Sequence, residues 1–213
     1  CIAIGSYAMD ATAGNAQAGT VAIGYNSLTA LTSGEKNVAI GYQSQLENAI
    51  GDSNIAIGYN AMFGSLASLQ NDNNIAIGSE NAAGSVLAAM GGQWTSNLSS
   101  NNIAIGTGSM SGAMNDSHNN TAVGYKSLAA ITIGDNNVAV GKESGLALTS
   151  GSENVAIGRE AMAVATTAGE NVAIGTTALG AVQAGSGANV AVGFYAMRSV
   201  DEGTGDGDAD YNV

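Results

Sequence analysis

The chain has 213 residues, with 31 glycines, no proline and only 5% aromatic residues. Its formal net charge is −12, with five lysines and arginines in total. This balance argues against nucleic-acid binding and against binding to an anionic membrane, because both require clustered cations. The sequence contains no run of about 18 apolar residues, so we expect no membrane insertion.

A four-residue pattern, Val/Ile-Ala-Ile/Val-Gly, recurs along the chain at intervals of mostly about 17 residues. Its copies end at Gly5, Gly24, Gly41, Gly58, Gly78, Gly106, Gly124, Gly141, Gly158, Gly175 and Gly193. A fixed period of this size predicts one supersecondary unit stacked many times. The predicted fold is therefore all-β: a parallel β-roll, or β-solenoid, of about eleven coils.

Each copy of the pattern predicts a short strand, because Val or Ile stands on both sides of a central alanine. Thr121 is the one exception before an alanine. We expect the Val/Ile pair to form the thin core of each coil. The alanine, for example Ala39 or Ala156, then faces the other side, where only a methyl group fits. An unvarying alanine on that side predicts packing against another subunit.

The residues around the strand predict how each coil turns. Asparagine stands four residues before the glycine in nine copies, as at Asn37 and Asn154. We expect these amides to stack in a hydrogen-bonded ladder and to adopt the left-handed backbone of a tight corner. Gly41 and Gly158 should mark the next corner, where a Cβ would clash. A small residue and then Leu or Met follow, which predicts a second short strand before a polar turn.

The repeats predict one β-roll domain over residues 1–199, followed by an acidic Gly/Asp-rich tail or linker over 200–213. The period breaks at an insertion over about 84–100, which holds the only tryptophan, Trp94. Loops that leave a solenoid often carry binding. Trp94 is therefore a candidate binding residue; the alternative is a loop that folds back over the edge of the coil.

Tyr25, Tyr42 and Tyr59 occupy the position after the glycine in three successive coils. Their spacing predicts an aromatic ladder. Such a ladder can stack on sugar rings, or it can simply stabilise neighbouring coils as cross-strand pairs do. We favour the stabilising role and keep the three tyrosines as candidate binding residues.

Catalysis is not expected. Glu143 and Glu160 lie in one column, and a close carboxylate pair would suit a retaining glycosidase. They follow Lys142 and Arg159 directly, however, so diagonal salt bridges explain them without catalysis. His118 is the only histidine and lies in a polar turn, which argues against a catalytic triad or a zinc site.

No cofactor is expected, with one open alternative in the tail. Asp206, Asp208 and Asp210 have the spacing of the first three ligands of a calcium loop. Tyr211 stands where that loop has its glycine. The tail is thus either a calcium site or a disordered acidic linker, and we favour the linker.

The segments Asn37 to Ser44 and Asn154 to Ala161 read Asn-Val-Ala-Ile-Gly-x-x-Ser/Ala. This motif resembles the head repeats of trimeric autotransporter adhesins, and it is similar to the repeat arrays of phage tail fibres. Asn119 to Leu128 is nearest to the phage style. The resemblance covers almost all of residues 1–199, although the coils here are longer than those of the adhesin heads.

The resemblance implies a left-handed β-roll, opposite to the general rule for parallel crossovers, with three identical chains side by side. It implies a structural and adhesive role, in a phage tail fibre that attaches to a host surface. The alternatives are the head of a bacterial trimeric surface adhesin and, from another class, a polysaccharide depolymerase. The implied partners are two further copies of the chain and a host cell-surface glycan or protein. The implied location is extracellular, on a virion or a bacterial cell surface.

Overall fold

The structure is a computed structural model that describes residues 1–11, 17–64, 70–79, 90, 98–181 and 187–198. These residues form eleven strands and no helix, so they contain no candidate membrane-spanning helix. The strands are β1 (Ile2–Ile4), β2 (Val21–Ile23), β3 (Val38–Ile40), β4 (Ile55–Ile57), β5 (Ile75–Ile77), β6 (Ile103–Ile105), β7 (Thr121–Val123), β8 (Val138–Val140), β9 (Val155–Ile157), β10 (Val172–Ile174) and β11 (Val190–Val192).

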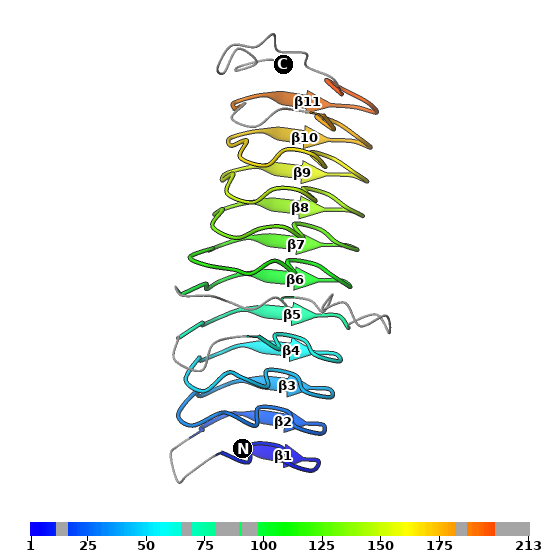
Figure 1. Cartoon of the computed structure of the whole chain (residues 1–213). Helices are drawn as coiled ribbons and strands as arrows, with labels where there is room; N and C mark the ends of the chain where they lie inside the picture. The colour runs from blue at the N-terminus through cyan, green and yellow to red at the C-terminus, as the bar shows by residue number, and fades with distance from the viewer. Residues whose placement is uncertain (12–16, 65–69, 80–89, 91–97, 182–186, 199–213) are drawn as a thin grey trace.

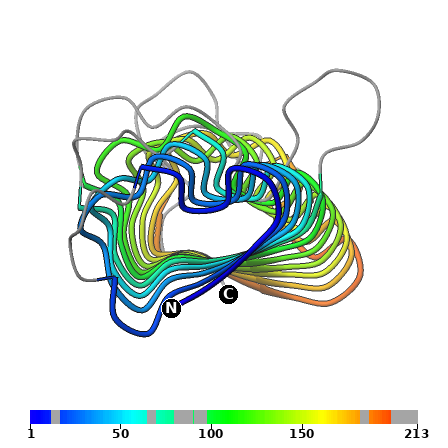
Figure 2. The same ribbon diagram turned by 90° about the horizontal axis from the view of Figure 1, so that it is seen from below.

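The strands pair in chain order into one parallel, 11-stranded sheet (Figure 1). Each strand meets the next at the same position of the repeat, so that Ala39 pairs with Ala56 and Ala139 with Ala156. This register turns every position of the repeat into a column that runs along the stack. Seen along its axis, the chain winds around a common interior (Figure 2). The predicted parallel β-solenoid is confirmed.

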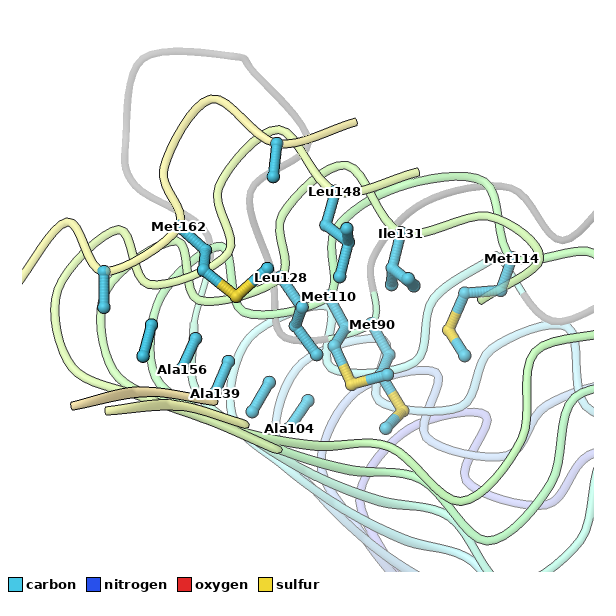
Figure 3. Packing of buried hydrophobic residues seen from close by; sticks show 14 of the residues in the cluster. Met90, Ala104, Met110, Met114, Leu128, Ile131, Ala139, Leu148, Ala156 and Met162 are labelled. Atoms are coloured by element: carbon cyan, nitrogen blue, oxygen red, sulfur yellow. The ribbon is translucent and has the colours of Figure 1, made fainter. Parts of the chain in front are cut away.

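The two sides of each strand are the reverse of those predicted. The central alanines of β2 to β11 are at most 3% exposed, whereas the Val and Ile beside them are half-buried or exposed. The alanines point into the coil, where Ala104, Ala139 and Ala156 approach the Leu and Met side chains of the opposite wall (Figure 3). Alanine is required because that wall fills the interior and leaves space for a methyl group only.

The opposite wall is not a second strand. In its place, two residues per coil have left-handed backbone, for example Asn26 (φ 55°) and Leu28 (φ 49°). This backbone turns Leu28 inward, where it is fully buried. Neighbouring coils are still hydrogen-bonded there, since the Leu28 N–H donates to the Ser44 carbonyl oxygen at 3.1 Å. We predicted that each coil consists of a strand, a corner, a second strand and a turn. The second strand is wrong.

The asparagine column forms the predicted amide ladder. The Asn137 side chain donates from Nδ2 to Asn120 Oδ1 (3.0 Å) and to the Gly151 carbonyl oxygen (2.9 Å). Its own Oδ1 accepts from the Asn154 N–H at 3.0 Å. The left-handed corner residue is not the asparagine but the residue before it, here Asn136 at φ 58°. Turning the chain one residue earlier leaves Asn137 free to point inward, where only 1% of it is exposed.

The glycine after each strand is explained by both its backbone and its surroundings. Gly158 has φ +133°, a backbone conformation that residues with a Cβ rarely adopt. A Cβ on Gly158 would lie 2.5 Å from the Gly175 carbonyl oxygen in the next coil. The predicted corner, with no room for a Cβ, is confirmed.

Candidate functional site

The outer side of the sheet is an apolar surface. Two residues of each strand point outward, and all of them are Val or Ile except Thr121. Side chains in the middle of this surface remain accessible: Ile105 is 37% exposed and Val140 is 36% exposed. We call the outward Val and Ile residues of β1 to β11, with Thr121, the sheet face. At about 4.8 Å per strand the sheet face is about 48 Å long.

No break in the repeat interrupts the sheet face. The longest spacing between pattern glycines lies between Gly78 and Gly106, yet Ile75 and Ile103 pair in the same register as every other strand. The residues that the structure does not describe all lie outside the eleven strands. The sheet face therefore continues from β1 to β11.

The predicted tyrosine ladder is present at the corner that follows the strands. The rings of Tyr25 and Tyr42 stack with centroids 5.4 Å apart and planes at 13°. Those of Tyr42 and Tyr59 stack at 5.0 Å and 6°. Tyr7 extends the ladder edge-on, 5.8 Å from Tyr25. Sequence reasoning missed Tyr7, because it stands two residues after its glycine instead of one.

The ladder geometry limits what these rings can bind. Sugars stack on the face of an aromatic ring, and both faces of Tyr42 are covered by its neighbours at about 5 Å. Only ring edges and hydroxyl groups remain accessible along the middle of the ladder. Stacked rings at such distances contribute about 0.5–1.5 kcal/mol per pair beyond their burial. The arrangement favours the stabilising role over sugar stacking.

Further along the same corner the tyrosines give way to charged residues. Lys142 Nζ lies 3.5 Å from a Glu143 carboxylate oxygen, and an Arg159 guanidinium nitrogen lies 2.6 Å from a Glu160 oxygen. Both pairs join sequence neighbours, not residues diagonally across coils as the sequence had suggested. The left-handed backbone of Glu143 and Glu160 (φ 57° and 58°) turns each carboxylate back toward the preceding cation.

His118 belongs to a hydrogen-bond ladder in the polar turns. Its Nδ1 accepts from the Ser100 N–H at 3.2 Å, its Nε2 lies 3.1 Å from Asp116 Oδ1, and its own N–H donates to Asp135 Oδ1 at 2.6 Å. Other coils place Asp or Ser in the same column as acceptors. We did not predict this ladder from the sequence, although the recurrence of Asp, Ser and His at one position of the repeat indicates it. Both imidazole nitrogens therefore take part in structural hydrogen bonds.

Several candidate residues lie outside the described part of the chain: Trp94, and Asp206, Asp208 and Asp210 of the tail. Within the described ranges, no group of three His, Cys, Asp or Glu side chains could hold a metal ion. The calcium interpretation of the tail therefore stays a prediction.

Comparisons with protein families, with curated proteins and with solved structures each found no match to this chain. The features that bear on function are therefore the surfaces and side-chain ladders of the chain itself. The largest of these is the sheet face.

Proposed function

We propose that this chain is a rod-shaped segment of a homotrimeric extracellular fibre, of the phage tail fibre type, that attaches to a host surface. One observation carries the proposal: a row of Val and Ile along the outside of the eleven strands, with Thr121 as the one exception. Two positions per strand over about 48 Å give a footprint of about 500 Å². The largest apolar patch of a typical soluble monomer covers about 300–600 Å² and is often functional, and the sheet face is of that size.

Burial of the sheet face explains why these positions stay apolar. A solvent-facing side of a sheet ordinarily alternates to polar residues, but here β-branched apolar residues occupy every outward position except that of Thr121. Stable association buries about 800 Å² per partner. The sheet face with its two flanking corners offers an area of that order. Most soluble homo-oligomers have closed symmetry, and the choice of three copies here comes from the resemblance to trimeric adhesin heads.

The remaining surface suits a spacer that also presents contacts. Charged residues make up only 10% of the chain, and the turns are rich in Asn, Ser and Thr. The departures from the 17-residue period all fall between the strands in the sequence. Such variable connections are where binding specificity ordinarily lies. We therefore assign attachment to a host glycan or protein to these connections and not to the sheet face.

Two measurements test the proposal. Sedimentation equilibrium at micromolar concentration should give the mass of three chains, with an elongated shape in sedimentation velocity. A stable monomer would contradict the proposed fibre. The fluorescently labelled trimer should bind host cells and be displaced by excess unlabelled trimer. If the chain forms trimers but binds neither cells nor a glycan array, the proposed adhesive role is wrong and the rod acts only as a spacer.

A further inference from the structure

The two corners that border the sheet face carry opposite charges at nearly the same height. We call the residues directly after the pattern glycines the glycine corner, and those directly before the buried asparagines the asparagine corner. The glycine corner has Lys142 after β8 and Arg159 after β9. The asparagine corner has Glu153 before β9 and Glu170 before β10. All four residues are exposed.

The acids of the asparagine corner are held in place but form no ion pair among the described residues. Glu153 and Glu170 have left-handed backbone, with φ 62° and 60°. Their N–H groups donate to the Asp135 and Ser152 carbonyl oxygens, each at 2.9 Å. Two like charges one coil apart, about 4.8 Å along the stack, repel each other. A cation from outside the chain would relieve this repulsion.

The cations of the glycine corner can still accept a second partner. The side chains of Lys142 and Arg159 are 53% and 52% exposed although each lies beside a glutamate. An exposed ion pair between sequence neighbours contributes at most about 1 kcal/mol. Arginine has five N–H donors in a planar fork, so Arg159 can bind a second carboxylate while it keeps Glu160.

In a ring of identical chains the two corners meet. A cyclic trimer uses heterologous contacts, in which one edge of a subunit packs against the opposite edge of its neighbour. All chains then run parallel and share the same heights. At shared heights Arg159, after β9, faces Glu153, before β9, of the next copy, while Lys142 lies one coil before this pair and Glu170 one coil after it.

We propose that Arg159 pairs with Glu153 of a neighbouring copy, with Lys142 and Glu170 one coil to either side, and that this pair favours the parallel direction of the chains in the assembly. The inference rests on the proposed trimer. The sheet face alone does not set the direction of the chains, because Val and Ile line it from β1 to β11 with Thr121 as the one exception.

An antiparallel arrangement makes a different prediction. If two copies packed face to face with opposite directions, centred on β6, β9 would lie opposite β3. Like corners would then meet, and Glu153 would face Lys36, the exposed cation of the asparagine corner before β3. The partner of Glu153 therefore separates the two arrangements.

The experiment is a charge-reversal series followed by sedimentation equilibrium at low and high salt. Glu153→Arg and Arg159→Glu should each weaken trimer association by at least about tenfold, because each reversal acts at three equivalent contacts. The double variant Glu153→Arg/Arg159→Glu should recover most of the loss. Glu47→Arg, on the wall opposite the strands, is the matched control and should leave association unchanged. Circular dichroism and thermal unfolding check that each variant keeps its fold.

The possible failures are distinct. A monomeric parent chain would overturn the proposed trimer itself. A trimeric parent with single reversals that change nothing would overturn only the corner pairing. Rescue of Glu153→Arg by Lys36→Glu, but not by Arg159→Glu, would overturn the pairing in favour of an antiparallel assembly.

Discussion

The two sides of a strand should respond oppositely to substitution. In β8 and β9, Val140 and Ile157 point outward as neighbours in register, whereas Ala156 points into the coil. The double variant Val140→Thr/Ile157→Thr keeps β-branched residues that suit a strand. It removes apolar surface only from the sheet face. Ala156→Leu adds volume to an interior where only 3% of the alanine is exposed.

The expected magnitudes follow from the remaining exposure. Burying a Val or Ile side chain completely is worth about 1.5–3 kcal/mol. Val140 is 36% exposed and Ile157 is 37% exposed in the single chain, so burial in an assembly would add about 1–2 kcal/mol per chain for the pair. Three chains give about 3–6 kcal/mol, and each 1.4 kcal/mol is a factor of ten. The threonine pair should therefore weaken trimer association by at least about a hundredfold.

Ala156→Leu should instead destabilise the fold of the chain itself. Overpacking a filled interior costs about 1–3 kcal/mol. In a chain of this size each kcal/mol lowers the Tm by about 2–4 °C. Sedimentation equilibrium measures the first effect, and thermal unfolding of dilute, dissociated chains measures the second. The face assignment would be refuted if Ala156→Leu altered association alone while the threonine pair unfolded the dissociated chain.

Three further substitutions test the interior and the tyrosine ladder, each followed by chemical denaturation. Asn137→Ala should lower the free energy of unfolding by about 2–4 kcal/mol, because it leaves the buried Asn154 N–H and Gly151 carbonyl without their amide partner. A decrease below about 0.5 kcal/mol, the size of an average surface substitution, would contradict the amide ladder. Gly158→Ala should cost about 3 kcal/mol or more through strain and the clash with the next coil; a stable, soluble variant would argue against that corner. Tyr42→Ala should lower the free energy of unfolding by about 1–3 kcal/mol, because two ring stacks are lost. Glycan binding should stay unchanged, and its loss would favour the sugar-stacking interpretation instead.

Much of the fold could be predicted from the sequence because the information repeats. One period, with a strand motif in each copy, determined the parallel solenoid, since identical short strands can bury their backbone groups only against the next copy. The asparagine column predicted the amide ladder, and the glycine column predicted a corner without space for a Cβ. The tyrosine column predicted stacked rings. In each case a residue of the column contacts the identical residue at the same position of the next coil.

Only the tertiary structure decided which side of the strand faces inward. Alternation assigns Ala156 and Ile157 to opposite sides but does not say which side is the core, and the larger, more apolar residue was the natural choice for it. The answer depends on the distance to the opposite wall. That wall is built from left-handed residues whose Leu and Met side chains fill the interior and leave a methyl-sized gap. Because the alanines occupy that gap, the Val and Ile of every strand are turned outward, and the surface on which the proposed assembly depends follows from the packing of the other half of the coil.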